Sequence, residues 1–460
     1  MREVEGSTGG RAAFGRDWTQ GSVIGNLLRL SWPMMISSSL NMLGPTIDMI
    51  WVGKLGTAPI AGVGVAGTAV MLVNSAMMGF VVGARAIIAR FMGAGDARGA
   101  NHAARQAFVL SASFGIALAA IGMFFAESIL MLMGVEPAVV TQGAAYLRIM
   151  FVGSLAMSVR MITEGTMQAS GDSMTPMKIA VSFRLLHIAI CPLFVFGWWL
   201  FPRLGVSGAA VTNVMSQTLG MALGLWFLFS GRTRLRLTLD NFRFDPGIIW
   251  RIVRIGIPAS FTGMGRSLGH FALMWIMVPF GTLAVAAHSL TQRIEVQLFF
   301  PIMGLGMGAG VLAGQNLGAG QPERAERSSW LAVGLGEGFM VACAVLILLW
   351  AEKAVGIFST EPALVELASI FLRIAAVGYL VLGLNAVMGQ CLSGVGDTVP
   401  PMLVTILTIW VMQIPLSLLL PRVTNLDVYG VRWAMVIGMV AGAVAYIIYF
   451  RLGRWKRKRV

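Results

Sequence analysis

Charged residues are rare in this sequence. Only 12% of its 460 residues are charged, about half the share that is usual in a soluble domain. Hydrophobic residues make up 57% of the chain, and the mean hydropathy is +0.79. Apolar runs of about 20 residues recur from end to end, and each is long enough to cross the ~30 Å hydrocarbon core of a bilayer. The composition excludes a soluble globular protein and predicts an all-α integral membrane protein.

Cysteine is scarce as well. Cys191, Cys343 and Cys391 all fall inside apolar runs, where a thiol behaves as a small hydrophobic side chain. We therefore expect neither a disulfide nor a metal site. The chain also lacks a nucleophile–base set with the spacing of a catalytic site, so we expect neither an enzyme nor a bound cofactor.

Twelve apolar segments are long enough to be membrane spans. They lie at about 27–50, 58–82, 106–127, 141–163, 176–200, 206–229, 252–279, 283–312, 330–351, 366–389, 400–421 and 428–451. The polar stretch before the first of them lacks the apolar core of a signal peptide. Most Lys and Arg residues outside the spans lie in alternate connecting segments, whereas the other connections hold few, among which we count Arg432. This bias predicts that both termini lie in the cytoplasm of a plasma (inner) membrane protein.

The net charge of +14 does not indicate nucleic-acid binding, because it follows the membrane topology. The basic end, RLGRWKRKRV, is most simply a topology anchor that also contacts anionic lipid headgroups. We therefore expect membrane lipids, and not nucleic acid, among the partners of this chain.

The chain contains two copies of one unit. When the sequence is shifted by 225 residues against itself, Pro33 meets Pro258, Gly93-Ala94-Gly95 meets Gly318-Ala319-Gly320, and Gly171-Asp172 meets Gly396-Asp397. A single offset that holds over about 145 residues indicates a duplication. Each copy holds six spans, so both run in the same direction and should be related by a pseudo-two-fold axis along the membrane normal. Parallel halves of this kind are typical of transporters that hold the substrate between them.

The duplication suggests a division of the chain. We expect a cytoplasmic tail at 1–26, an N-lobe at 27–229, a cytoplasmic linker at 230–247, a C-lobe at 248–451 and a basic cytoplasmic tail at 452–460. Two repeated turns have a physical explanation. Glycine in each Gly-Ala-Gly supplies a positive φ, and the aspartates Asp172 and Asp397 are expected to bond backbone donors at a helix start.

Several motifs resemble one family. They are LSWPMMISSSLNMLGPTIDMIWVGKLGT in the first span, the paired turns RFMGAGDARGA and GQNLGAGQPERAER, ASGDSMTPMK with SGVGDTVPPM, RLGVSGAAVTNVMSQ and MQIPLSLLL. In this order, around a duplicated six-span unit, they resemble the multidrug and toxic compound extrusion (MATE) transporters over almost the whole chain. The resemblance implies twelve helices in two parallel six-helix lobes. It also implies secondary antiport, in which organic cations and other amphipathic drugs leave in exchange for protons or sodium ions.

The resemblance assigns a role to one aspartate and leaves others open. Asp48 matches the first-span aspartate that carries the coupling cation. Where one family branch has asparagine and aspartate in the fifth span, this chain has His187 and Cys191. Where another branch has carboxylates in the seventh and tenth spans, it has Arg266 and an apolar position near Leu382. A sodium site in the C-lobe is therefore not expected.

Ionisable residues that do not repeat are the better functional candidates, because duplicated scaffolding cannot explain them. A carboxylate inside a membrane costs several kcal/mol and marks a functional site unless it caps a span at the interface; both readings of Asp48 are open from the residues alone. Arg184, His187 and Cys191 share one helix face. We expect Asp48 to bind the coupling cation, a proton in preference to sodium, with His187 as a second titrating group. A structural role for His187, and an ion pair for Arg184, are the alternatives.

Glu295 is the candidate for attracting organic cations in a central chamber. Arg184, Cys191, Met42 and Met49 are further candidates for the wall of that chamber, since thioethers adapt to varied ligands. Arg160 and Glu164 have the spacing of a pair along one helix. Arg266, His270 and Glu337 receive no role from the sequence.

Two functions from different classes remain open at this point. The first is a monomeric antiporter for small amphipathic or cationic molecules. The second is a flippase of a lipid-linked precursor from the related superfamily, which the arginines within the spans, such as Arg266, leave possible.

Overall fold

Helices make up nearly all of the described chain. The computed structural model describes residues 17–55, 57–132, 137–199, 201–238, 240 and 242–458, and no strand occurs among them. The first half contains α1 (Val23–Val52), η1 (Gly53–Leu55), α2 (Thr57–Gly93), α3 (Ala97–Leu132), α4 (Pro137–Val152), α5 (Ser154–Ser170), α6 (Met174–Phe196) and α7 (Val206–Ser230). The second half contains α8 (Pro246–Met277), η2 (Val278–Phe280), α9 (Thr282–Gly318), α10 (Pro322–Gly356), α11 (Pro362–Gly394), α12 (Val399–Thr405), the π-helical segment η3 (Ile406–Gln413), α13 (Ile414–Val423), α14 (Val428–Arg451) and η4 (Arg454–Arg457). The prediction of an all-α membrane protein is confirmed.

The helices follow the expected spans, but the fourth and the eleventh spans are each divided into shorter segments. Eight described helices are long and apolar enough to cross a membrane by length and composition, and the pair α4–α5 makes a ninth. That pair bends by 46° at Gly153. The eleventh expected span divides into α12, η3 and α13. A π-helical stretch widens the backbone ladder and is frequent at functional sites.

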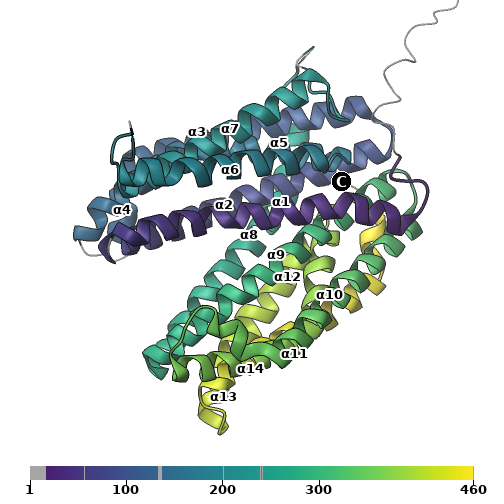
Figure 1. Cartoon of the computed structure of the whole chain (residues 1–460). Coiled ribbons are helices and arrows are strands. Elements are labelled where there is room, and N and C mark those ends of the chain that lie inside the picture. The colour runs from purple at the N-terminus through teal and green to yellow at the C-terminus, as the bar shows by residue number, and fades with distance from the viewer. Residues whose placement is uncertain are drawn as a thin grey trace, which may run out of the picture.

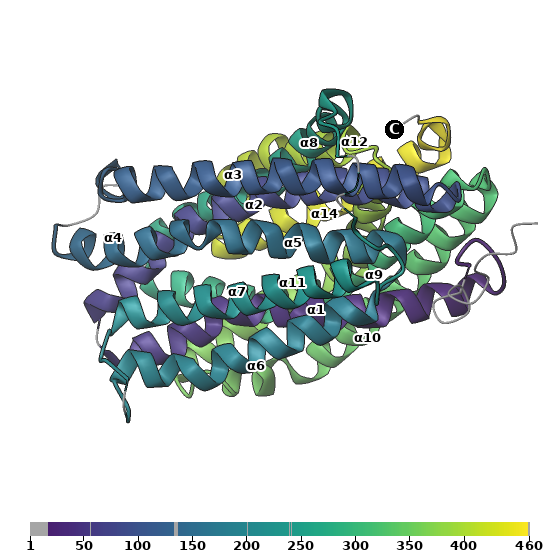
Figure 2. The ribbon, with the colours of Figure 1, turned by 90° about the horizontal axis from the view of Figure 1, so that it is seen from above.

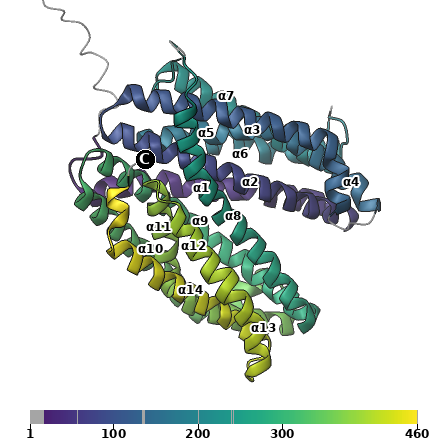
Figure 3. The ribbon, with the colours of Figure 1, turned by 180° about the vertical axis from the view of Figure 1, so that it is seen from behind.

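The chain folds into two bundles that spread apart at one end. Figure 1 shows α1–α7, the first bundle, above α8–α14, the second bundle. The start of α1 and the C-terminal end lie where the bundles meet, and the opposite ends diverge, as the view from behind also shows (Figure 3). Seen from above, the helices of both bundles run lengthwise in roughly one direction (Figure 2).

Direct contacts join the bundles from the middle of the helices toward the end that carries the termini. Ser260 Oγ donates to the carbonyl of Ala76 at 2.9 Å, and Gln315 Nε2 donates to the carbonyl of Ala169 at 2.7 Å. Glycine allows helix backbones to approach closely here: a Cβ at Gly304 of α9 would collide with the backbone of Met35 in α1. These close contacts hold the bundles together over the half of the molecule that carries the termini.

The repeated turns confirm one expectation and correct another. Gly95 and Gly320 have φ values of 76° and 73°, as the Gly-Ala-Gly pattern predicts. Asp172 accepts from the backbone N–H of Thr175 at 3.0 Å, so it caps a helix start as expected. The same role is wrong for Asp397, because the chain end approaches it: its carboxylate accepts from Tyr449 at 2.5 Å and pairs with Lys458 at 3.0 Å.

The linker between the halves is docked on the start of α3. Gln106 Nε2 donates to the carbonyl of Arg243 at 2.7 Å, and His102 Nε2 lies 3.1 Å from Asp245 Oδ2. Asp245 is also the N-cap of α8, since its Oδ1 accepts from the N–H groups of Gly247 and Ile248 at 2.9 and 3.1 Å. One carboxylate therefore fixes both the linker and the first turn of the second bundle.

Replacing Asp245 with alanine should lower the unfolding temperature in a pH-dependent way. The hydrogen bond with His102, followed by the backbone donors, lowers the pKa of Asp245 from its ordinary value. A folded pKa below the unfolded value of about 3.9 stabilises the protein above that pH, and the benefit is lost as the pH falls through the folded pKa. Thermal unfolding of wild type and Asp245→Ala should therefore differ at pH 7, and the difference should shrink as the pH falls below the unfolded value and through the lowered folded pKa. The linker variant Asp240→Ala is the control, and a gap that stays unchanged on acidification would contradict the assignment.

Candidate functional site

Asp48 lies inside the first bundle, near the diverging end of the molecule. Its residue is only 1% exposed, although it stands one turn before the end of α1. Side chains from α4, α6 and α7 surround it: Tyr146, His187, Cys191 and Asn213, all of them buried. The interpretation of Asp48 as a cap at the water interface is therefore wrong, because the neighbouring helices exclude water from it.

Hydrogen-bond donors point at this carboxylate. Asn213 Nδ2 donates to Oδ2 at 3.1 Å, and the Tyr146 hydroxyl approaches the same oxygen at 3.4 Å. His187 Nε2 lies 3.0 Å from Oδ1, but in a bent geometry that is closer to an electrostatic contact than to a good hydrogen bond. Donors of this kind stabilise an ionised carboxylate in a place where burial alone would penalise it.

The orientation of the Asn213 amide is set by a chain of side chains. Glu164 and Arg160 form a buried ion pair along α5, which confirms the pairing predicted from their spacing. Arg160 also donates to the Oε1 of Gln217, and Gln217 Nε2 approaches Asn213 Oδ1 at 3.5 Å. Because a guanidinium can only donate, each amide in the chain must turn its NH₂ group toward the next acceptor. The chain therefore ends with the NH₂ group of Asn213 facing Asp48.

Arg184 approaches Asp48 through His187 and not directly. Arg184 NH1 lies 3.2 Å from His187 Nδ1, and NH2 donates to the carbonyl of Asn41 at 3.2 Å. Arg184 forms no ion pair among the described residues. The alternative in which it was expected to pair with a carboxylate therefore differs from the structure. Since the guanidinium donates to Nδ1, the hydrogen of a neutral His187 ring must sit on Nε2, facing Asp48.

This tautomer bears on whether the cluster can hold a metal ion. Ligand atoms of Asp48, His187 and Cys191 all lie within 4.8 Å of one another, a donor set that zinc accepts. However, His187 Nε2 carries the hydrogen as long as Arg184 occupies Nδ1, and a protonated nitrogen has no lone pair for a metal. The residues present therefore do not fit a resident metal ion.

The second bundle contains a cavity of about 230 Å³, which we call the second-bundle cavity. Its walls come from α8, α9, α11, α12, η3 and α14, and they include Arg266, His270, Glu295, Tyr379 and Asn385. Glu295 was expected to face a central chamber, but the wall in which it lies belongs to this cavity of the second bundle alone. Its carboxylate is 3.5 Å from Arg432 NH1. Arg432 is 2% exposed within α14. Counting it among the residues of an outer connection was wrong, because it lies inside the helix bundle.

The other candidate residues are scattered. Arg184 and Cys191 are buried beside Asp48 and are absent from the wall of the second-bundle cavity. Met49 is 38% exposed on α1, and the side chain of Met42 lies outside the described ones. Glu337 of α10 accepts from the backbone N–H of Leu384 at 2.8 Å, so it joins α10 to α11.

Sequence reasoning missed several partners of the two sites. Asn213 and Gln217 lie within a motif that pointed to the family, yet nothing in the motif connected them to Asp48. Tyr146 and Arg432 carried no signal, since their partners are distant in sequence.

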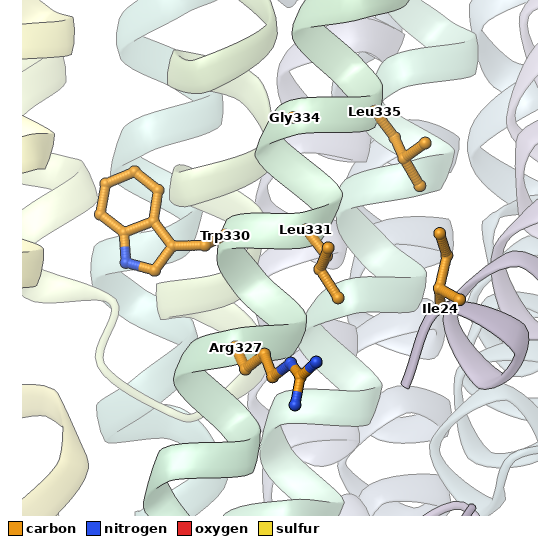
Figure 4. Close-up of a pocket in the computed structure, with 6 residues that line it drawn as sticks. All are labelled: Ile24, Arg327, Trp330, Leu331, Gly334 and Leu335. Atoms are coloured by element: carbon orange, nitrogen blue, oxygen red, sulfur yellow. The ribbon is translucent and has the colours of Figure 1, made fainter. Parts of the chain in front are cut away.

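A separate groove of about 480 Å³ lies outside both sites (Figure 4). Its wall is mainly apolar and comes from the start of α1 and from α10: Ile24, Arg327, Trp330, Leu331, Gly334 and Leu335. None of these residues contributes to the Asp48 cluster or to the second-bundle cavity.

Comparisons with known proteins agree with the duplicated architecture. The MatE family model matches residues 33–193 and again 258–419, with the same offset of 225 residues between the two starts. The chain is 24% identical to the probable multidrug resistance protein NorM of Thermotoga maritima, over 94% of this chain and 93% of the relative. It is also 24% identical to the FAD transporter of Shewanella oneidensis, over 85% and 87% of the two chains.

The fold also matches that of a solved transporter over nearly the whole chain. A crystal structure of MATE in complex with MaL6 superimposes with a TM-score of 0.90 at 25% identity, and the match covers 96% of this chain and 99% of the other. The family model, the full-length relatives and the shared twelve-helix fold agree that this chain is a member of the MATE family of multidrug efflux transporters, and not an enzyme.

Proposed function

We propose that this chain is a secondary antiporter that exports amphipathic organic compounds, organic cations among them, in exchange for protons. The observation that carries the proposal is the Asp48 carboxylate, which is buried in a membrane-embedded bundle among hydrogen-bond donors. A buried carboxylate of this kind is costly to retain and is typical of ion-coupling sites.

The groups around Asp48 favour a proton over sodium. A hard cation needs several oxygen ligands, but the groups that face Asp48 are the NH₂ group of Asn213, the ring N–H of His187 and the hydroxyl of Tyr146. Two of these present hydrogens and no lone pair. A proton needs only the carboxylate oxygen itself, so the site suits proton uptake and release better than sodium binding.

The two-bundle shape supplies the alternating access. The positive-inside bias places both termini in the cytoplasm of a plasma (inner) membrane. In that orientation the bundles touch near the cytoplasmic side and diverge toward the outside (Figure 1), which leaves the Asp48 end of α1 on the outer side. Rocking of one bundle against the other would then expose the sites to the two sides in turn.

His187 serves in this proposal as the positioning group of Asp48. A second proton on the ring must go to Nδ1, which Arg184 occupies at 3.2 Å. The Arg184 guanidinium therefore fixes the orientation of the ring, with Nε2 facing Asp48.

The test is transport by purified protein in proteoliposomes with imposed ion gradients. A fluorescent amphipathic cation should accumulate against its gradient when a proton gradient is present, and a sodium gradient of equal size at symmetrical pH should drive no accumulation. Collapse of the proton gradient with an ionophore is the control. Accumulation that follows sodium and ignores protons would refute proton coupling.

A further inference from the structure

We propose that the second-bundle cavity binds the carboxylate group of an amphipathic substrate, with the Arg266 guanidinium as its cationic partner. This inference rests on the proposed transport function and narrows its substrate class: acidic or zwitterionic amphipathic molecules would bind better than matched molecules without the carboxylate. It concerns a different bundle and different residues from the Asp48 cluster.

The charges around the cavity do not cancel. Glu295 is the carboxylate in its wall, and the buried Arg432 lies 3.5 Å behind it, so these two groups neutralise each other. Arg266 of α8 lines the same cavity. Within the described residues Arg266 has neither an ion pair nor a hydrogen bond. Its guanidinium carbon lies 5.8 Å from the centre of the Phe299 ring, in a cation–π contact. The unbalanced charge that faces the cavity is therefore positive.

An unsatisfied donor lines the same cavity. The Tyr379 hydroxyl belongs to a residue that is 1% exposed, and it has no hydrogen-bond partner among the described residues. A buried hydroxyl without a partner is costly, so a partner such as a ligand, an ion or water is expected at such a group. A carboxylate oxygen would accept from this hydroxyl and at the same time pair with Arg266.

The rest of the wall suits the apolar part of such a molecule. Phe299, Leu382, Val404, Ile409 and Met439 supply aromatic and aliphatic surface. Ile409 belongs to the π-helical segment η3, which also contributes Thr408 and Gln413 to the wall of the cavity. A mainly apolar pocket with a few polar groups is the usual form of a small-molecule site.

An organic cation fits this cavity poorly. Its natural partner would be Glu295, but that carboxylate already faces Arg432, and Arg266 would repel the incoming charge. The two copies of the repeat also differ in charge at these positions. Arg266 corresponds to Asn41 in the first half, and Asp48 corresponds to Leu273 in the second half. The acidic group thus lies in the first bundle and the free basic group in the second.

The experiment is a binding titration with dansylglycine and its amide, which differ only in the carboxylate. Purified protein in detergent at pH 7, without any ion gradient, should bind dansylglycine more tightly, with a rise in dansyl fluorescence as the ring enters the apolar cavity. A charge-assisted hydrogen bond to carboxylate is worth enough that Arg266→Gln should weaken dansylglycine binding by about ten- to a hundredfold. Binding of the amide should change by less than about twofold, since the amide makes no ion pair with Arg266.

Two further variants keep the test decisive. Arg266→Lys retains the charge and should keep most of the preference for the acid, whereas Arg254→Gln removes an exposed arginine about three turns earlier on α8 and should leave both affinities unchanged. Equal affinity of the wild-type protein for acid and amide would overturn the proposal, as would an equal loss of both in Arg266→Gln. Because no gradient is used, these outcomes are independent of whether transport is coupled to protons.

Discussion

Asp48→Asn should abolish transport driven by a proton gradient, down to the leak of protein-free liposomes. Asparagine has nearly the same shape as aspartate but cannot take up and release a proton. It would also place an NH₂ group among the donors that now face the carboxylate, from Asn213, Tyr146 and His187. Because the two side chains have nearly the same volume, the substitution removes the proton-carrying group with little change in the packing of the surrounding helices.

The measurement is accumulation of a fluorescent amphipathic cation in proteoliposomes with equal protein content. Glu352→Gln is the matched control, because this carboxylate is exposed and pairs with Arg373 at 3.0 Å at the surface, where such a pair contributes little. Asp48→Asn should also retain the binding of dansylglycine, which separates loss of coupling from loss of the fold. Full-rate, proton-driven accumulation by Asp48→Asn at normal protein levels would show that Asp48 does not carry the coupling ion.

Arg432→Met should destabilise the second bundle by about 3–5 kcal/mol, because it removes one partner of a buried ion pair. Methionine keeps much of the volume of arginine and its contacts with Phe371, so the cost arises mainly from Glu295, which loses the cation 3.5 Å away. Thermal unfolding in detergent, followed by tryptophan fluorescence, would record the change as a lower apparent unfolding temperature.

The double variant Arg432→Met with Glu295→Gln tests the reason for this loss. Replacement of both partners of a buried pair is often close to neutral, so the double variant should recover much of the stability lost in Arg432→Met. Glu295→Gln alone should also be destabilising, since it leaves Arg432 as an unpaired cation that is 2% exposed. A double variant whose loss equals the sum of the two single losses would mean that the two groups do not act as a pair.

Much of the architecture follows from local patterns, which a sequence displays directly. The low charge and the recurring apolar runs predict membrane helices, because backbone groups in hydrocarbon must bond within their own segment. The shift of 225 residues predicts the duplication, and the family model matches twice with that same offset. The pairing of Arg160 with Glu164 was also predictable, because a spacing of four residues brings two side chains together on one face of a helix.

The environment of each polar residue could not be predicted as well from the sequence, because it depends on which helices pack together. Asp48 stands near the end of an apolar run, and only the packing of α4, α6 and α7 around it decides that it is buried and not at the interface. Asp172 and Asp397 occupy equivalent positions in the two copies, yet the second meets Lys458 from the chain end. Repeated sequence predicts repeated turns, but not the neighbours that come from elsewhere in the chain.

The order of residues alone is enough to predict a duplicated helical membrane protein, and it distinguishes Asp48 as a carboxylate without a counterpart in the other half. What surrounds that carboxylate follows only from the packing of the helices, from the Arg160–Gln217–Asn213 chain to His187 held by Arg184. The packing also decides that Glu295 is balanced by Arg432, which leaves Arg266 as the free charge of the second-bundle cavity. The physical reason is that spans and turns depend on neighbours a few residues away, whereas the net charge of a cavity depends on side chains that meet only when helices distant in the chain pack together.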